Sequence, residues 1–290
     1  MSAATFFRLV GEAERGERLR EEIDELAAGR ARGATFSVEA DSIRSVPGSP
    51  VAYWIDHGVR QLFDEGELVE GSGRAVRQGL ATADDTRFLR LWWEVPSSAL
   101  LSVENCVAGE GGSSFVQQCR GQVAGGRSWV PIAKGGKYSP FASDVHLVVS
   151  WEGGGAQLRV SDRPRVQNEG YYFRPGLTWP RRSQRGFSLR VLPAGCIFGD
   201  KGPSIFAAED CTPVLLALLA ILNSEPFRRL LGLQMAFGSY EVGVIQRTPL
   251  PRLSIEFREL LATLAGHAFE LARARHRRRD SARLRSTSTC

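Results

Sequence analysis

The residues of this sequence that could act on a partner are arginine, lysine and glutamine side chains set around glycine-rich turns. The first set flanks a turn of small and acidic residues at positions 79–85. At alternate positions of a strand, arginine can donate to guanine and glutamine can pair with adenine. The alternative for each side chain is a solvated or ion-paired surface position. We predict DNA contacts here for Arg77, Gln78, Arg87 and Arg90.

Later segments repeat this combination of cations with glycine or aromatic residues. Lys134 and Lys137 bracket a glycine pair, where a backbone without side chains can approach a phosphate closely. A basic-aromatic loop covers 178–185, and a glycine-flanked turn follows at 199–204. From these segments we predict DNA contacts for Lys134, Lys137, Thr178, Trp179, Arg181, Arg182, Arg185, Lys201 and Ser204.

Acidic and aromatic residues in the same segments have a structural interpretation. Asp84 and Asp85 would repel phosphates, so we expect them to cap the turn. The tryptophans Trp54, Trp92, Trp93 and Trp151 are expected in the core.

Several catalytic and cofactor motifs are missing. The glycines at 109 and 111 are followed by serine at 114, which breaks the dinucleotide-binding pattern. Lys137 has Pro131 where a phosphate-cradling P-loop needs its first glycine, and Tyr138 where it needs serine or threonine. The sequence contains no GxSxG or HExxH motif. We therefore predict no catalytic and no cofactor-binding residue.

Composition narrows the remaining possibilities. The five cysteines are an odd number without a CxxC pair and the four histidines are scattered, so no metal site is predicted and reduced cytosolic thiols are expected. The longest apolar run, 214–222, is too short to span a bilayer, and no secretory signal is evident. We expect a cytoplasmic protein.

Charge is mildly basic and strongly biased toward arginine. The net charge is +5, and all of the 37 basic residues except Lys134, Lys137 and Lys201 are arginines. A GC-rich genome explains this bias without any functional role, whereas bidentate binding of phosphate and guanine would also favour arginine. The charge permits a polyanionic partner without requiring one.

Hydrophobic spacing predicts helices toward both ends of the chain. They are expected at 13–28, from a start at Ser49-Pro50 to Gly66, at 213–222, at 226–233, and from an N-cap at Ser254. The last helix should place Phe257, Leu260, Leu261, Leu264, Ala268 and Leu271 on one side. It runs into an arginine-rich tail at 273–279, which is either a solvated charge run or a nucleic-acid contact.

Between these helices the chain is expected to be rich in strands and glycine joints. Strands are predicted at 75–77, 89–95, 129–132, 145–150, 187–192 and 196–198, with another at 35–38. The predicted fold class is α+β: a mixed, strand-rich domain at 74–250, preceded by a helical segment at 1–73 and followed by a helix and tail at 251–290. Loops on such a scaffold can present many side chains to a partner.

Four segments, in order, resemble the target-recognition half at the C-terminal end of large adenine-specific DNA methyltransferases. These are the modification enzymes of BREX-type (PglX-like) phage defence and of related type II restriction-modification systems. The matching segments are 46–54 (VPGSPVAYW); 77–95 (RQGLATADDTRFLRLWWEV); 129–136, 171–179, 187–193 and 198–206; and 219–227 with 239–245 and 249–251. The likeness covers nearly the whole chain.

The resemblance implies a DNA-sequence-recognition module whose catalytic half lies outside these residues. Methylation of adenine N6 needs an Asn/Asp-Pro-Pro-aromatic turn, and no two prolines are adjacent here. S-adenosylmethionine is therefore expected in the missing half, and the implied partners are double-stranded DNA and a methyltransferase catalytic domain or subunit. The alternatives are a protein-interaction module that docks through the terminal helices, and a non-functional remnant of a split gene.

The sequence departs from the family pattern in two places. Ala83 replaces a glycine and Asp85 an asparagine of the family's turn, which could alter its backbone and polarity. After Ala272 the arginine-rich end replaces an expected acidic, tryptophan-containing stretch.

Overall fold

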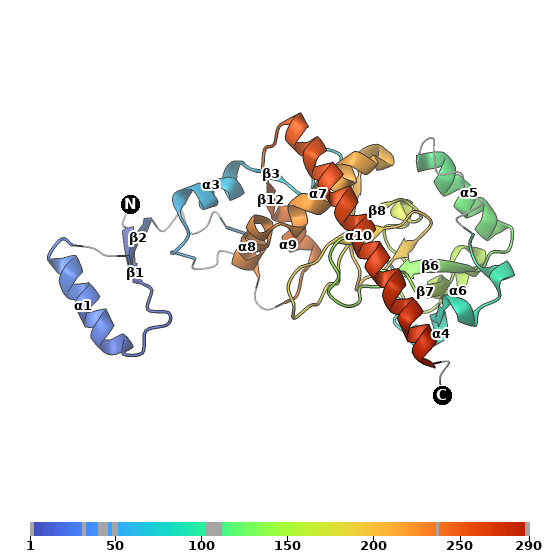
Figure 1. The fold of residues 1–290 in the computed structure, drawn as a ribbon, viewed down its shortest axis with the longest axis horizontal. Helices are drawn as coiled ribbons and strands as arrows, with labels where there is room; N and C mark the ends of the chain where they lie inside the picture. The colour runs from blue at the N-terminus through green and yellow to red at the C-terminus, as the bar shows by residue number, and fades with distance from the viewer. Residues whose placement is uncertain are drawn as a thin grey trace.

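The computed structural model describes residues 3–30, 33–39, 46–47, 52–102, 112–235 and 238–287. An N-terminal unit lies at one end of the molecule, and the remaining elements form a larger body (Figure 1). In this unit β1 (Ala3–Phe7) pairs antiparallel with β2 (Thr35–Glu39), and α1 (Arg15–Ala27) connects them. The predicted helix at 13–28 and strand at 35–38 are confirmed.

The next helix among the described residues is α3 (His57–Glu65), and residues 52–56 before it are not helical. Ser49 and Pro50, the expected start, lie outside the described residues. The side chain of Asp56 accepts a hydrogen bond from the Val59 amide at 2.9 Å and caps the helix. Trp54 therefore precedes the helix and is 39% exposed, so its predicted core position is wrong.

Two four-stranded sheets form the centre of the larger body. One has the order β4 (Arg74–Arg77), β11 (Ser204–Ala207), β8 (Gly176–Thr178), β9 (Arg190–Leu192), and all of its pairings are antiparallel. The other has the order β10 (Ile197–Phe198), β6 (Trp129–Ala133), β7 (Leu147–Ser150), β5 (Leu89–Leu91). Only its β10–β6 pairing is parallel. A small sheet joins β3 (Glu67–Leu68) to β12 (Pro249–Leu250).

Each four-stranded sheet contributes to its own buried cluster. Val130, Ile132 and Trp151 lie in the cluster that also contains Phe115 and Val116 of α5 (Gly112–Ala124). Val76, Leu177 and Ile205 lie in a second cluster, which is completed by the C-terminal helices. These helices are α7 (Thr212–Asn223), α8 (Glu225–Gln234), α9 (Val242–Arg247) and α10 (Ile255–Thr287).

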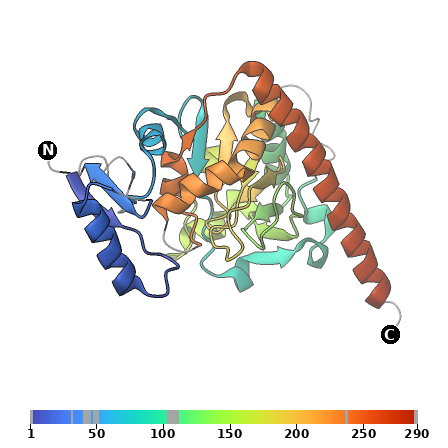
Figure 2. The ribbon, with the colours of Figure 1, turned by 60° about the vertical axis from the view of Figure 1, so that its left-hand side comes forward.

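The long helix α10 lies across the larger body and runs from its top to the C-terminal end (Figures 1 and 2). The Ser254 hydroxyl accepts from the Phe257 amide at 3.2 Å, which confirms the predicted N-cap. The predicted inward face is wrong in large part. Ala262 and Ala265 are the residues buried against the body, whereas Phe257, Leu260, Leu264 and Leu271 are 49–69% exposed.

The tryptophan predictions are corrected at the end of β5. The strand stops at Leu91 because Trp92–Glu94 turn into a 3-10 helix, in which the Glu94 carboxylate accepts from the Leu91 amide at 2.7 Å. Trp92 and Trp93 are 50% and 56% exposed, so neither is a core residue, whereas Trp151 is buried as predicted.

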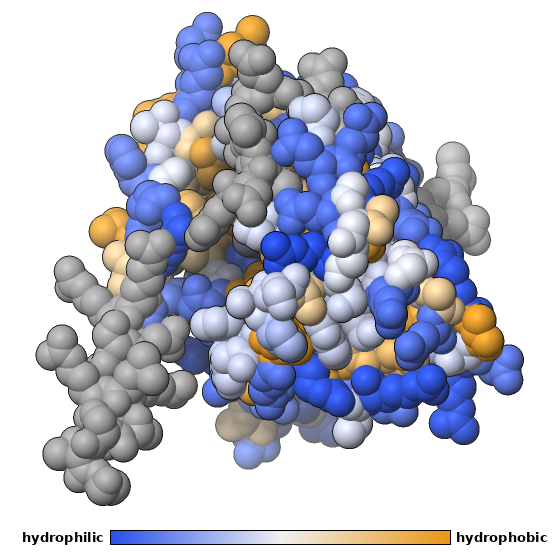
Figure 3. All heavy atoms as spheres, turned by 90° about the vertical axis from the view of Figure 1, so that its right-hand side faces the viewer, coloured by the Kyte–Doolittle hydropathy of each residue, from blue (hydrophilic) through white to orange (hydrophobic). Residues whose placement is uncertain are grey.

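The face on the α5 side of the body is mostly hydrophilic, with scattered hydrophobic side chains (Figure 3).

The mixture of helices and short strands confirms the predicted α+β class. Short elements complete the body: α4 (Asp85–Phe88) and α6 (Ala156–Val160), with 3-10 turns at Ser97–Ala99, Glu152–Gly154, Glu169–Tyr171 and Ala208–Asp210. Across the described ranges, no helix combines the length and apolar character needed to cross a membrane.

Candidate nucleic-acid interface

Three loops that the sequence patterns singled out meet at one carboxylate, that of Asp85. Thr82 donates to this carboxylate from within the 79–85 turn, and the Lys134 ammonium donates to both groups. Lys201 lies 3.9 Å from the other carboxylate oxygen. Asp85 therefore ties the 79–85 turn to the 134–138 loop and the 199–204 turn. Asp84 has the predicted capping role, since it accepts from the Arg87 amide at 3.0 Å.

Glycines allow these loops to pack backbone against backbone. A β-carbon on Gly79 would overlap the carbonyl oxygen of Phe198, and one on Gly135 would overlap that of Lys201. A β-carbon on Gly202 would overlap the amide nitrogen of Gly135. The glycines that suggested close approach to a phosphate thus serve, in part, close approach between neighbouring loops.

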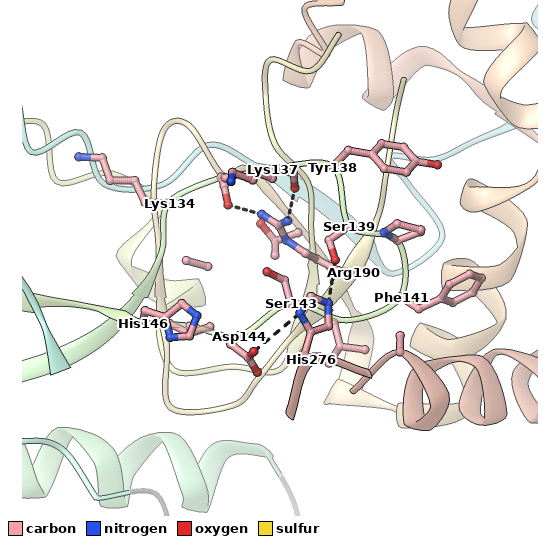
Figure 4. Close-up of a pocket in the computed structure, with 18 of the residues that line it drawn as sticks. Lys134, Lys137, Tyr138, Ser139, Phe141, Ser143, Asp144, His146, Arg190 and His276 are labelled. Atoms are coloured by element: carbon pink, nitrogen blue, oxygen red, sulfur yellow. Dashed lines mark hydrogen bonds and ion pairs between the residues drawn. The ribbon is translucent and has the colours of Figure 1, made fainter. Parts of the chain in front are cut away.

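A cavity of about 990 Å³ opens beside the 134–138 loop. Its charged lining is strongly basic, because a single carboxylate, that of Asp144, faces several cations. Figure 4 shows Lys134 directed away from the groups around Arg190, in keeping with its pairing to Asp85. The basic and histidine residues that line the cavity are Lys134, Lys137, His146, Arg185, Arg190, Arg275 and His276.

Arg190 is the most deeply buried of these cations, with 4% of its surface exposed. Its guanidinium donates to the carbonyl oxygens of Gly135 and Lys137, the latter at 3.0 Å (Figure 4). Burial lowers the pKa of Arg190 to about 10, so the group stays charged at neutral pH. No carboxylate pairs with it among the described residues.

His276 of α10 reaches the cavity wall between a serine and an aspartate (Figure 4). Its Nε2 lies 3.1 Å from the Ser139 hydroxyl, and its Nδ1 lies 3.9 Å from the Asp144 carboxylate. Ser139, His276 and Asp144 thus follow one another as the nucleophile, base and acid of a catalytic triad do. The Ser139 hydroxyl, however, donates to the Ala142 carbonyl at 2.7 Å. The Nδ1–carboxylate distance also exceeds a hydrogen bond. The arrangement is therefore a tertiary contact and not an activated nucleophile.

The predicted DNA-contacting residues divide into exposed, ion-paired and buried groups. Four of them take part in ion pairs: Arg77 with Glu70 at 2.7 Å, Arg181 with Glu241 at 2.7 Å, Lys134 with Asp85, and Lys201 with the same Asp85 at 3.9 Å. Gln78 is half-buried. The exposed cations are Arg87, Arg90, Lys137, Arg182, Arg185 and Lys201.

The prediction is corrected for Thr178, Trp179 and Ser204, whose side chains are buried. Trp179 and Ser204 are both 0% exposed, and Thr178 is 2% exposed. Trp179 donates from its indole nitrogen to the Tyr240 carbonyl at 2.9 Å, and Thr178 donates to the Pro203 carbonyl at 3.0 Å. A duplex cannot reach these atoms in this structure, so we withdraw direct contact by these side chains. For the remaining residues DNA contact stays a prediction.

Sequence patterns did not connect the other half of the cavity to the 134–138 loop, although the tail at 273–279, with Arg275 and His276, was one alternative for a nucleic-acid contact. Arg190 lies in a short strand whose sequence resembles that of any core strand, and Arg275 and His276 belong to a helix far along the chain. Nothing local marks these three as neighbours of the 134–138 loop. No group of three or more potential metal ligands occurs among the residues that the structure describes.

Comparisons with known proteins connect this architecture to a class of enzyme. No model of a protein family matches the sequence. The chain is 26% identical over 224 residues to the adenine-specific methyltransferase PglX of Lacticaseibacillus casei (strain Zhang), a stretch covering 75% of the chain. It is 27% identical over 235 residues to the adenine-specific methyltransferase BrxX of Escherichia coli O9:H4 (strain HS), covering 81%.

The matched stretch is a small part of each relative, 17% of its length. This similarity extends over most of the chain and agrees with the motif resemblance found in the sequence. It supports a relationship between this chain and the BREX-type adenine-specific methyltransferases.

Proposed function

We propose that this chain is the DNA-sequence-recognition portion of an adenine-specific (N6) DNA methyltransferase of a phage-defence or restriction-modification system. The observation that carries the proposal is the meeting of three motif loops beside a cavity whose lining holds several cations and one carboxylate. Phosphate contacts position such a module on the duplex, and contacts to base edges select the sequence.

We further propose a division of the chain that follows this role. Residues 74–250 form the target-recognition domain, 1–73 lead into it, and 251–290 form the C-terminal helix and tail. The methyl donor, S-adenosylmethionine, and the catalytic Asn/Asp-Pro-Pro-aromatic turn belong to a catalytic domain or subunit outside these residues. The whole assembly acts on cellular DNA in the cytoplasm.

The exposed cations differ from the paired ones in what they can contribute. Lys137 and Arg185 are exposed on the cavity lining, and Lys201 is exposed with only a long ion pair to Asp85, at 3.9 Å, so all three side chains can reach phosphates. Arg77 and Arg181 already bind carboxylates, so a DNA contact would have to replace or share an ion pair. We therefore assign the phosphate contacts to the first group and rank the second lower.

The test is a binding series with the 290-residue chain and duplexes from methylated and unmethylated host DNA. We expect binding at low salt, with an affinity that falls steeply as salt rises. A triple variant, K137Q/R185Q/K201Q, should lose most of this affinity. Arg20→Gln, an exposed arginine on α1, serves as the control and should retain it. If the wild-type chain does not bind DNA at low salt, the proposal is overturned.

A second candidate function, docking of another protein, is favoured by the exposed apolar side chains of the terminal helices. Leu19, Ile23 and Leu26 of α1 are 37–46% exposed, and Leu260 and Leu264 of α10 are 52% and 53% exposed. The partner that fits the proposed role is the methyltransferase catalytic domain or subunit. Replacing Leu260 and Leu264 by glutamine should then prevent co-purification with that partner while DNA affinity stays unchanged.

A further inference from the structure

The 134–138 loop owes its conformation to a cation behind it. The buried Arg190 guanidinium donates to the carbonyl oxygens of Gly135 and Lys137, so both carbonyls point toward the interior (Figure 4). Gly135 and Gly136 have φ values of 76° and 114°, which side-chain-bearing residues rarely adopt. The glycine pair is therefore required for the path that brings both carbonyls to one guanidinium.

The inward carbonyls fix the direction of the next amides. In a planar trans peptide the C=O and the following N–H point in opposite directions, and the described residues contain no cis peptide. The N–H groups of Gly136 and Tyr138 consequently point away from Arg190, toward the outer side of the loop. Gly136 and Lys137 are both exposed.

These two N–H groups have no protein acceptor among the described residues. Two cations belong to the same part of the structure. Lys137 separates them in sequence, and the Arg185 guanidinium lies 5.6 Å from the centre of the Tyr138 ring. Outward amides two positions apart, with cations in the same loop region, form an arrangement that can bind tetrahedral oxyanions.

We propose that the outer side of the 134–138 loop binds one phosphate group. The N–H groups of Gly136 and Tyr138 donate to its oxygens, and Lys137 and Arg185 neutralise its charge. Arg190 is a positioning residue, since it holds the carbonyls inward and does not touch the phosphate. Lys134 takes no part because its ammonium binds Asp85.

The phosphate comes from a DNA backbone or from a free phosphate ester, and two measurements separate these sources. The first titrates inorganic phosphate into the full chain and follows binding by calorimetry. Lys137→Gln and Arg185→Gln should each weaken phosphate binding by about tenfold, as expected for the loss of a charge-assisted hydrogen bond. Arg229→Gln, which removes a 79% exposed arginine on α8, should leave it unchanged.

The second measurement follows duplex affinity as a function of salt. If a backbone phosphate occupies the loop, Lys137→Gln should lower the salt slope by about one, equally for every sequence. This arm extends the proposed function, whereas the phosphate titration is independent of it. A wild-type chain that ignores DNA but binds phosphate would refute DNA recognition and keep this site for a free phosphate ester.

The test of Arg190 must distinguish positioning of the 134–138 loop from a general stabilisation of the fold. Arg190→Lys keeps a donor to the loop carbonyls and should retain most of the affinity for the anion, whereas Arg190→Met, which has no donor, should lose it at temperatures where both variants are folded. The site is refuted if neither inorganic phosphate nor the DNA salt slope responds to Lys137 and Arg185. It is refuted equally if Arg229→Gln has the same effect as the loop variants.

Discussion

The ammonium of Lys134 and the carboxylate of Asp85 form an ion pair across 49 positions of the chain. The Lys134 side chain is 6% exposed, and its ammonium donates to this carboxylate and to the Thr82 hydroxyl. The pair joins the 79–85 turn to the 134–138 loop, which carries the proposed phosphate contact of Lys137. An aspartate where the related enzymes were expected to have asparagine thus has a structural role here.

Asp85→Asn should destabilise the fold by about 1–2 kcal/mol, because it leaves a buried ammonium without its counter-charge. The loss is smaller than for a fully buried pair, since the Asp85 side chain is 49% exposed and partly screened. Urea unfolding at neutral pH measures it. Asp84→Asn removes the same charge from the neighbouring position but keeps an N-cap, so it should change stability by less than about 0.5 kcal/mol. Equal effects of both substitutions would contradict the assignment.

The same pair should make stability depend on acid pH. Burial acts to raise the pKa of Asp85, but hydrogen bonds from Lys134 and Thr82 outweigh it and hold the pKa below 3.8, its ordinary value. A depressed carboxyl pKa stabilises the fold above the ordinary value, and this contribution disappears as pH falls through the folded-state pKa. The difference in unfolding free energy between wild type and Asp85→Asn should be largest well above the ordinary value of 3.8 and should shrink as pH falls below that value. A difference that is the same above and below that value would contradict the shift.

The sequence predicted local structure well wherever a side chain decides it alone. The cap at Ser254 and the helices from Arg15 and Thr212 follow from capping and apolar spacing. Patterns failed where burial depends on a distant partner. Ala262 and Ala265 of α10 are inside because a small residue allows close helix packing, while Leu260, Leu264 and Leu271 of the predicted face are exposed.

Only part of the candidate site could be predicted from the sequence, for a related reason. Glycine pairs and cations mark the 134–138 loop in the sequence, but Arg190 and His276 reach it only through the tertiary fold. Conversely, Trp179 and Ser204 carry the right chemistry and are buried by the same packing. Residue type identifies candidates, and sheet topology decides which of them face solvent.

Asn223, in the segment that resembles the family's LLNS motif, should be needed for stability. The carbonyl oxygen of the Asn223 side chain accepts from the Leu189 amide, and its amide nitrogen donates to the Leu189 carbonyl, both at 2.9 Å. This one side chain therefore pairs with both backbone polar groups of Leu189. Asn223→Ala leaves these buried groups unpaired and should cost about 3 kcal/mol in unfolding free energy. The exposed Gln184→Ala, measured in the same denaturant series, should stay within about 0.5 kcal/mol of wild type. A near-neutral Asn223→Ala would show that water replaces both bonds.

Gly79 should be intolerant of any side chain. A β-carbon there would overlap the Phe198 carbonyl, a backbone atom that cannot move without shifting β10. We expect Gly79→Ala to destabilise by about 3 kcal/mol, the upper range of overpacking. Gly170 has no atom within 4 Å of an added β-carbon and no positive φ, so Gly170→Ala should be neutral or slightly stabilising. Thermal unfolding of both variants compares them, and similar midpoints would argue against close packing of the 79–85 turn.

The two sides of α10 should respond to substitution in opposite ways. Ala265 is 1% exposed in the cluster shared with α7, so Ala265→Leu should overpack it and cost about 1–3 kcal/mol. Leu264 is its neighbour in sequence yet 53% exposed, and Leu264→Gln should change stability by no more than about 0.5 kcal/mol. Denaturant unfolding of the isolated chain tests both. A large loss for Leu264→Gln alone would mean that the leucine side of α10 packs within the chain, which would remove the basis for a docking face on this helix.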